Sequence, residues 1–331
     1  MLEQAPVSPD LPPPEAQRFG TVAILGAPNA GKSTLVNALV GSKVSIVTPK
    51  VQTTRTRITG IALVGDVQMV LHDTPGIFAA KRALDSAMVE AAWSGMKDAD
   101  LAVVMVDARR KPDTLGDDTA RIVEGLQRHR RKAILVLNKV DLVAKPTLLA
   151  LAQSLTNPNP SQGDAGEGVI SPESAFTDVF MISALNGSGV EQLKSFLVSK
   201  MPKGPWHYPP DQMADAPMRF LAAEITREKL FLSVYDELPY GLTVETENWE
   251  ERGPKKGVRI DQRIYIARES HKPIILGKGG TLLRDIGTKA RLEIAELLGR
   301  PVHLFLQVSV RPGWIDEPAR WREMGLDYKR T

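Results

Sequence analysis

The chain has 331 residues, which is enough for two domains that each bury a hydrophobic core. Its formal net charge of +3 and its sequence pI of about 9.0 describe a mildly basic protein rather than a polyelectrolyte. The chain contains no cysteine, which excludes disulfides and thiolate metal sites and suits a reducing cytoplasm. No apolar run approaches the length of a membrane span, and we expect no signal peptide at the start of the chain.

The first predicted feature is a disordered leader at residues 1–18, which carry five prolines and few large apolar residues. Beyond it, apolar segments of strand-like and helix-like length alternate from Thr21 to Lys200. This alternation is typical of a parallel sheet with helices on both faces. We therefore expect an α/β domain with a doubly wound, mostly parallel sheet over residues 19–201.

Residues 26–33 read G-A-P-N-A-G-K-S, a complete G-x-x-x-x-G-K-S phosphate-binding loop. The loop lies between an expected strand at residues 21–25 and an expected helix at residues 34–40. Glycines let the backbone N–H groups turn towards phosphate oxygens, and the helix adds its N-terminal partial positive charge. Lys32 is predicted to reach the β- and γ-phosphates, and the Ser33 hydroxyl to ligate Mg²⁺. The motif predicts a P-loop NTPase that binds a nucleoside triphosphate.

A second motif, D-T-P-G at residues 73–76, closes an expected strand that begins at Gln68. A D-x-x-G turn there places Asp73 beside Mg²⁺, through a water, and lets the Gly76 N–H sense the γ-phosphate. Taken alone, D-T-P-G is also a common turn sequence. Upstream, residues 42–57 have no clear periodicity and contain two adjacent threonines. Of these two we favour Thr54 as the residue that completes the Mg²⁺ shell when GTP is bound.

The choice of base is predicted by N-K-V-D at residues 138–141, which follows an apolar strand at residues 133–137. The Asp141 carboxylate can accept hydrogen bonds from guanine N1–H and the exocyclic amine, a donor pair that adenine lacks. Ser183-Ala184-Leu185, after a further strand at residues 178–182, fits a supporting loop on the base side. The bound nucleotide is therefore expected to be GTP or GDP.

The predicted nucleotide site joins these segments. Its binding residues are Gly26, Ala27, Pro28, Asn29, Ala30, Gly31, Lys32, Ser33, Thr34, Asp73, Thr74, Pro75, Gly76, Ile77, Asn138, Lys139, Asp141, Ser183, Ala184 and Leu185. Lys32, Thr54 and Gly76 are assigned to catalysis, and Ser33, Thr54 and Asp73 to Mg²⁺.

The rest of the chain changes in character. Residues 156–175 are rich in glycine, proline and polar residues and are expected to form a flexible insertion. Residues 202–214 are predicted to be a stiff, proline-rich linker to a second domain at residues 215–331. In that domain we expect two helices on a three-stranded sheet, an α+β module. These elements are predicted at residues 217–235 (helix), 242–250 and 257–268 (strands), 280–298 (helix) and 302–310 (strand).

Within the second domain, Gly277-Lys278-Gly279-Gly280 forms a G-x-x-G loop before the second helix. Glycines there let the backbone approach a sugar-phosphate chain, as in a KH domain. Lys278 can pair with a phosphate, and Lys272, Arg284 and Lys289 either extend this track or form a solvated helix face. A local basic run lies along the preceding hairpin: Arg252, Lys255, Lys256, Arg259 and Arg263 against Asp261. Trp314 and Trp321 in the tail could stack on bases or anchor the tail.

In this order the motifs resemble those of a translation-factor-like Ras-superfamily GTPase, and their detailed amino-acid sequences resemble those of the Era family. The wording that carries the resemblance is G-A-P-N-A-G-K-S-T, P-K-V-Q-T-T-R-T-R-I, D-T-P-G-I, N-K-V-D and S-A-L. The similarity continues through residues 217–230, 237–240, 274–280 and 301–306 to Gly313-Trp314, and so covers residues 20–328. The fold that it implies is a P-loop GTPase domain followed by a type II KH domain.

The resemblance also implies an activity and partners. The activity is slow hydrolysis of GTP to GDP and phosphate with Mg²⁺, and the partner is the 3′ end of 16S-type ribosomal RNA during assembly of the small ribosomal subunit. We expect a cytoplasmic monomer, and a peripheral contact with the inner face of the cell membrane stays open. An RNA chaperone with vestigial GTPase activity is the alternative. A metabolic phosphotransferase is disfavoured because guanine selection and an RNA module serve no small-molecule chemistry.

How water is activated is a separate question. Ras-type enzymes place a glutamine after the D-x-x-G turn, but Ile77 stands there and cannot orient water. Asn29 matches an asparagine that ligates K⁺ in GTPases of the tRNA-modifying class, so K⁺ is a further candidate cofactor. Asn29 could equally shape the loop only. No arginine of the chain is clearly placed to act as an arginine finger, and Arg55 stays open for that role.

Overall fold

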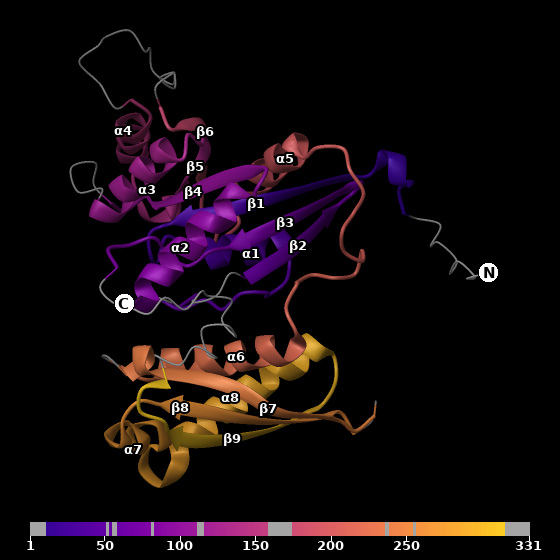
Figure 1. The fold of residues 1–331 in the computed structure, drawn as a ribbon, viewed down its shortest axis with the longest axis vertical. Helices are drawn as coiled ribbons and strands as arrows, with labels where there is room; N and C mark the ends of the chain where they lie inside the picture. Colours follow the sequence, from indigo (N-terminus) through magenta and orange to yellow (C-terminus); the bar gives the residue numbers. More distant parts are fainter. Residues whose placement is uncertain are drawn as a thin grey trace. The chain divides into compact units, whose positions relative to one another are not determined.

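The computed structural model describes residues 11–50, 53–54, 58–80, 83–110, 116–157, 174–235, 238–253 and 256–314. It divides into two compact units, which are described one at a time (Figure 1). The first unit comprises Met1–Val44, Arg57–Ala79 and Val89–Asp215. The second comprises Ser45–Thr56, Ala80–Met88 and Ala216–Thr331.

A six-stranded sheet forms the centre of the first unit, with the strand order β2-β3-β1-β4-β5-β6. Only the edge strand β2 is antiparallel to its neighbour, and every other pair is parallel, as predicted. The carboxyl ends of the five parallel strands therefore meet at one edge of the sheet, where ligands bind in such folds. The strands are β1 (Arg18–Gly26), β2 (Ile58–Val64), β3 (Val67–Asp73), β4 (Leu101–Asp107), β5 (Ala133–Asn138) and β6 (Phe176–Ile182).

Helices cover both faces of this sheet, so its strands read as nearly continuous apolar runs. Alternate residues of β1 enter opposite cores: Val22 and Ile24 one, Ala23 and Leu25 the other. Helices α1 and α5 pack into the first core, and α2, α3 and α4 into the second (Figure 1). The helices are α1 (Lys32–Val40), α2 (Ala83–Lys97), α3 (Gly116–Arg128), α4 (Lys145–Thr156) and α5 (Val190–Lys200).

The segment predicted as a linker, residues 202–214, packs on the first unit instead of forming a free spacer. The buried Gln68 side chain accepts hydrogen bonds from the backbone N–H groups of His207 (2.9 Å) and Tyr208 (3.0 Å). It also donates to the Tyr208 carbonyl at 2.8 Å, and the His207 ring stacks on Phe19. A buried amide must be satisfied in this way, and that requirement ties the segment to the sheet.

The first domain boundary also differs from the prediction. From the sequence we expect disorder up to residue 18, but Pro14–Ala16 form a 3-10 helix, η1, and Arg18 begins β1. The Gln17 side chain accepts a hydrogen bond from the Trp206 N–H at 3.0 Å, which explains the order of this stretch. Residues 1–10 lie outside the described residues, as does most of the predicted insertion, 158–173.

The second unit is the predicted α+β module with one addition, the short helix α7. Strand β8 pairs antiparallel with β7 and parallel with β9. Every second residue of β8 is buried, which places one face of the sheet against α6 and α8. The elements are α6 (Met218–Ser233), η4 (Leu238–Gly241), β7 (Leu242–Glu251), β8 (Val258–Ile266), η5 (Glu269–His271), α7 (Lys272–Leu276), η6 (Lys278–Gly280), α8 (Thr281–Leu298) and β9 (Val302–Val310).

Ser45–Thr56 also belongs to this second unit, where it contacts α6. The Val47 N–H donates to Glu228 Oε1 at 2.8 Å, and Arg227 Nη2 donates to the Thr53 carbonyl at 2.5 Å. Arg227 and Glu228 are both buried, and these contacts offset part of the cost of burying their charges, although Arg227 Nη1 is buried without a hydrogen-bond partner. None of the helices in the described ranges is long and apolar enough to cross a membrane.

Candidate functional site

The phosphate-binding motif forms a tight loop between β1 and α1, as its sequence predicts. Gly31 ends it with φ 100°, a value that favours glycine, and Asn29 adopts the left-handed region with φ 63°. A Cβ on Gly31 would lie 2.2 Å from Asn138 Nδ2, so the site has no room for a side chain there. The loop therefore has the curled backbone that turns successive N–H groups towards an anion.

The Lys32 side chain is hydrogen-bonded to the backbone of this loop. Its Nζ donates to the carbonyl oxygens of Gly26 and Ala27, each at 3.1 Å. Burial lowers the pKa of Lys32 from 10.5 to about 8, although the Asp73 carboxylate acts in the opposite direction. A buried ammonium with only carbonyl partners and one carboxylate nearby is suited to receive the negative charge of phosphates.

Two oxygen donors of the predicted Mg²⁺ site lie side by side. The Ser33 hydroxyl donates to Asp73 Oδ2 at 2.6 Å, and Asp73 is fully buried at the end of β3. Hydroxyl and carboxylate oxygens are the ligands that Mg²⁺ prefers, and it usually keeps waters and substrate phosphates as its other ligands. The described residues contain no cluster of three or more histidine, cysteine or acidic side chains that could hold a metal ion.

The D-x-x-G turn packs directly on the phosphate loop. A Cβ on Gly76 would lie 2.9 Å from Pro28 Cγ, so this close approach requires glycine. The Ile77 N–H donates to the Gly26 carbonyl at 3.1 Å, and the Ile77 side chain is buried in the core. The next residue after the turn is thus a packing residue, in keeping with the expectation that it does not orient water.

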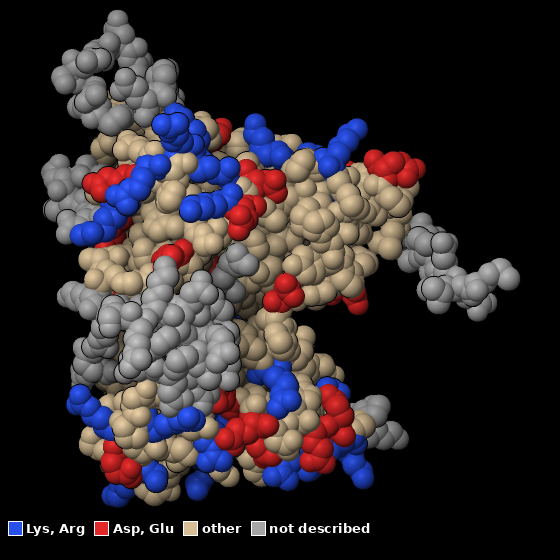
Figure 2. Space-filling model, viewed as in Figure 1, with Lys and Arg blue, Asp and Glu red and all other residues tan. Residues whose placement is uncertain are grey.

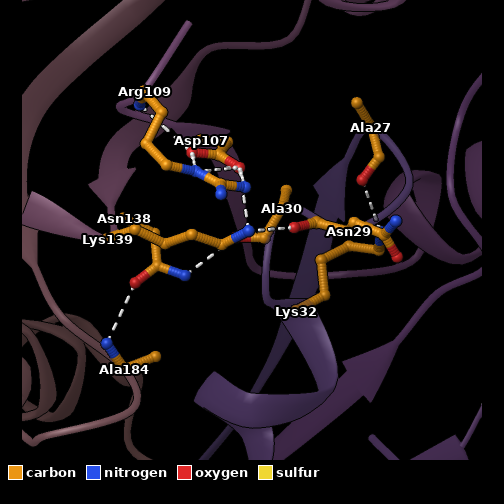
Figure 3. A network of polar contacts seen from close by, with 9 residues as sticks. All are labelled: Ala27, Asn29, Ala30, Lys32, Asp107, Arg109, Asn138, Lys139 and Ala184. Atoms are coloured by element: carbon orange, nitrogen blue, oxygen red, sulfur yellow. Dashed lines mark hydrogen bonds and ion pairs between the residues drawn. The ribbon is translucent and has the colours of Figure 1, made fainter. Parts of the chain in front are cut away.

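Two side chains of the loop at residues 138–141, called here the guanine-side loop, connect it to the phosphate loop (Figure 3). Asn138 donates from Nδ2 to the Ala30 carbonyl at 2.8 Å and accepts at Oδ1 from the Ala184 N–H at 2.9 Å. Lys139 Nζ donates to the Asn29 carbonyl at 2.7 Å. Asp141, the last residue of the N-K-V-D motif, is exposed.

Asp107 and Arg109 are part of this network, and the sequence reasoning missed both. Asp107 ends β4 and accepts from Lys139 Nζ at 2.8 Å and from Arg109 Nη2 at 2.6 Å. Burial raises the pKa of Asp107, but the hydrogen bonds from Arg109 and Lys139 outweigh it and lower the pKa to about 2. The available signal was an acidic residue directly after the apolar run Leu101–Val106, at the same kind of strand end as Asp73 and Asn138.

Other predicted residues are placed less completely. Thr54 is buried and belongs to the second unit, so its role as a Mg²⁺ ligand stays a prediction. Arg55 lies outside the described residues. Ser183 is buried, whereas Leu185 beyond it is 86% exposed, as expected of a loop at the site's edge.

The G-x-x-G motif of the second unit connects α7 to α8. Gly277, Gly279 and Gly280 all have positive φ, at 69°, 62° and 76°. A Cβ on Gly277 would lie 2.7 Å from Leu282 Cβ, whereas a Cβ on Gly279 or Gly280 would meet nothing within 4 Å. The open side of the loop is thus free for the close approach of another backbone, and Lys278 at its tip is exposed.

The basic groups around that loop are only partly available. Lys272 lies 3.9 Å from Glu269, and Lys289 forms an ion pair with Asp285 at 2.7 Å. Arg284 is exposed on the first turn of α8. These geometries fit either an extended phosphate track or a solvated helix face, so the roles of Lys272, Arg284 and Lys289 stay predictions.

The arginines of the basic run along the hairpin are paired and do not form a free positive surface. Its arginines pair with carboxylates, most of them on β7, which the sequence count left out. Figure 2 shows the two charge types interspersed over this unit. The pairs are Arg252–Glu250 at 3.1 Å, Arg259–Asp261 at 3.1 Å and Arg263–Glu247 at 2.5 Å. Lys255 lies outside the described residues.

Trp314 anchors the chain after β9 and does not present its ring for stacking. Its side chain is 1% exposed, and Nε1 donates to the Gly241 carbonyl at 3.2 Å. Of the two alternatives in the sequence, the structural one therefore holds for Trp314. Trp321 lies outside the described residues.

Comparison with known proteins identifies both halves of the chain. A family model described as "50S ribosome-binding GTPase" matches residues 21–139, and one described as "KH domain" matches residues 237–315. The "GTPase Era" of Afipia carboxidovorans is 52% identical over 313 residues, which cover 95% of this chain and 96% of the relative. The "GTPase Era" of Brucella suis is 54% identical over 312 residues, which cover 94% of each chain.

Two solved structures share the fold along nearly the whole chain. One is Era in complex with MgGDPNP and nucleotides 1506–1542 of 16S ribosomal RNA, with a TM-score of 0.83 and 34% sequence identity. The other is a variant of Era from Aquifex aeolicus bound to GDP.AlF4-, with a TM-score of 0.82 and 34% sequence identity. Each match covers 93% of this chain and 99% of the solved one. The chain belongs to the Era family of GTPases.

Proposed function

We propose that this protein is a GTP-hydrolysing switch that binds the 3′ end of 16S-type ribosomal RNA and acts in assembly of the small ribosomal subunit. One observation carries the nucleotide half: the phosphate loop, the Ser33–Asp73 pair and the guanine-side loop meet at one edge of the sheet. The relative whose structure holds MgGDPNP and 16S nucleotides supports both halves.

Within this proposal, the residues of the nucleotide site have distinct roles. Lys32 and the backbone of residues 26–33 hold the phosphates, while Ser33 and Asp73, the latter through a water, hold Mg²⁺. Gly76 senses the γ-phosphate. Asp141 selects guanine, with Asn138 and Ala184 supporting its loop. Mg²⁺ supplies charge neutralisation at the β- and γ-phosphates when it is bound.

Hydrolysis by this site is slow. The Ile77 side chain, in the position where Ras-type enzymes orient water, is buried among apolar residues. Positioning and charge stabilisation then remain as the means of catalysis, and K⁺ ligated by Asn29 would add to the second of these.

The RNA half rests on the loop at residues 277–280. Its backbone is open to a sugar-phosphate chain, and Lys278 is exposed at its tip to pair with a phosphate. Lys272 and Arg284 extend the contact. The proposed place of action is the cytoplasm, where 16S-type RNA is assembled, and a peripheral contact with the inner membrane face belongs to the same proposal.

RNA affinity in the two nucleotide states separates this function from its alternative. A single-stranded RNA of the 16S 3′ end is titrated against the full chain loaded with GDP or with a non-hydrolysable GTP analogue. A switch binds the RNA more tightly in one state, whereas equal affinity in both states indicates an RNA chaperone with vestigial GTPase activity. Crosslinking in growing cells, followed by sequencing of the attached RNA, identifies the bound sequence directly.

A further inference from the structure

The Lys139 ammonium is the junction between the two halves of the nucleotide site, and Asp107 is its charged partner. Lys139 Nζ donates to the Asn29 carbonyl of the phosphate loop at 2.7 Å and to Asp107 Oδ2 at 2.8 Å. Figure 3 shows the Asp107 carboxylate and the Lys139 ammonium converging beside the phosphate loop. No nucleotide-site motif of the sequence contains Asp107, so its presence in the network calls for a role.

The sheet order explains why this carboxylate reaches the site. Strand β4 lies between β1, which leads into the phosphate loop, and β5, which leads into the guanine-side loop. Asp107 is in register with Asn138, and the Ala108 N–H donates to the Asn138 carbonyl at 2.8 Å. A side chain at the end of β4 is therefore placed between the two loops by the backbone itself, before any side-chain contact is considered.

The two residues that meet at this junction have backbone conformations that need support. Asn29 and Lys139 both lie in the left-handed region, with φ 63° and φ 67°. Residues other than glycine adopt that region at an energetic cost, which is smaller for asparagine than for lysine, so Lys139 in particular persists there only when its surroundings hold it. The Lys139 bridge holds both at once, since it starts from one of these residues and ends on the carbonyl of the other.

The Asp107 end of the bridge is charged throughout the physiological pH range. Burial acts to raise its pKa, but Arg109 and Lys139 lower the pKa to about 2. Bonds between ionised partners are roughly twice as strong as neutral ones. Without the carboxylate, Lys139 would keep only the neutral Asn29 carbonyl as its hydrogen-bond partner at this junction. Because the Lys139 side chain is 24% exposed, its ammonium could then turn towards solvent.

We propose that Asp107 is a positioning residue for guanine-nucleotide binding, which acts through Lys139 to hold the phosphate loop and the guanine-side loop in register. This inference rests on the proposed function. It predicts that loss of the carboxylate speeds nucleotide release, because the two loops that enclose the ligand no longer share a fixed junction. Turnover at saturating GTP is expected to change less than KM, because the hydrogen bonds of Asp107 go to Arg109 and Lys139 and not to Ser33 or Asp73, the proposed Mg²⁺ ligands.

The chain offers a matched control at the other end of the same strand. Asp100, directly before β4, accepts hydrogen bonds from the Thr21 N–H at 2.7 Å and from the Thr21 hydroxyl at 2.9 Å. Asp100→Asn therefore makes the same chemical change to a carboxylate that joins β4 to β1 outside the nucleotide site.

The test is the dissociation rate of fluorescent methylanthraniloyl-GDP from the full chain, with Mg²⁺, after mixing with excess GDP. Asp107→Asn is expected to release the nucleotide about tenfold to a hundredfold faster, as for loss of a hydrogen bond between charged groups. Asp100→Asn stays within about threefold of the unchanged chain, as does Asp107→Glu, which keeps the charge. If Asp107→Asn does not fold, Asp107→Ala takes its place. Slow release of the nucleotide from Asp107→Glu is then compared with fast release from Asp107→Ala.

A double-mutant cycle with Lys139→Ala separates positioning from a general structural role. If Asp107 acts through Lys139, Asp107→Asn has little further effect once Lys139 is alanine. Equal release rates from Asp107→Asn and the unchanged chain, or the full effect of Asp107→Asn persisting in the Lys139→Ala background, would overturn the inference. Failure of the unchanged chain to retain the labelled GDP would overturn the proposed function instead.

Discussion

The molecule contains two glycine-rich loops that are each proposed to bind phosphates, and they differ in how the loop and its lysine are packed. In the loops at residues 26–33 and 277–280, a glycine in the left-handed region directly precedes a helix: Gly31 before α1 and Gly280 before α8. In the first, Lys32 is buried and bonded to two backbone carbonyls, and hydrogen bonds from other strands fix the loop. In the second, Lys278 is exposed, and a side chain on Gly279 or Gly280 would meet empty space.

The difference matches the size of the ligand that each loop is proposed to hold. A triphosphate is compact, so a loop that is organised in advance can surround it and gains strength from exclusion of water. A nucleic-acid strand is long, and its affinity comes from the number of phosphates contacted as much as from any single contact. A closed loop would exclude such a strand, whereas an open loop admits it. The four predictions that follow test this contrast.

The largest effect is expected for nucleotide choice at the first site. In Asp141→Asn an amide donor replaces one carboxylate oxygen, so GTP affinity falls by about a thousandfold or more and xanthosine triphosphate becomes the preferred ligand. Competition binding of GTP, ATP and xanthosine triphosphate measures the change. Equal competition by ATP and GTP in the unchanged chain would contradict the guanine assignment.

At the second site, replacement of Lys278 and Gly279 by aspartates should lower RNA affinity by about a hundredfold through phosphate repulsion, while GTP hydrolysis continues. A Cβ on Gly279 would meet no neighbour, but its φ of 62° strains an aspartate there, so Lys278→Asp alone is measured as the variant without backbone strain. A gel-shift titration with 3′-end 16S RNA measures the loss. Lys97→Asp, an exposed charge reversal on α2, is the control, and unchanged RNA affinity in the loop variant would mean that the loop is only structural.

Burial of Lys32 predicts a pH dependence that the exposed Lys278 does not share. Its pKa of about 8 means that the free site loses this proton above pH 8, whereas bound phosphates favour the charged ammonium. Nucleotide affinity should therefore fall by up to about tenfold between pH 7 and pH 9, with uptake of one proton on binding at the higher pH. Titration calorimetry in two buffers of different ionisation heat measures this uptake. Nucleotide affinity that is constant between pH 7 and pH 9 would show that burial does not lower the pKa of Lys32 into this range.

The smallest effect concerns K⁺. Turnover is expected to be a few-fold faster in KCl than in matched NaCl, because a K⁺ held by Asn29 stabilises transition-state charge. Asn29→Gly removes the amide without strain, since φ at this position is 63°, and it should abolish the difference between the two salts. Equal rates of the unchanged chain in the two salts would leave Asn29 with a loop-shaping role only.

The sequence alone determined the motifs, their order and the class of each domain. These features are local: glycines at positive φ, a strand that leads into a helix, and the period of apolar residues are all properties of short segments. Residues 26–33 and 277–280 therefore formed the predicted loops, and Ser33 met Asp73 because parallel strands end at one edge of the sheet. The expected strands and helices of both domains formed with small differences at their ends.

Only the tertiary structure decided which polar groups are paired across distant segments. Arg263 looked free in the sequence but meets Glu247 of the neighbouring strand, and residues 202–214 looked like a spacer but satisfy the buried Gln68. Asp107 had no motif around it, yet the strand order places it between the two nucleotide loops. Strand order and burial depend on how the whole chain packs, and a pattern read along one segment does not contain them.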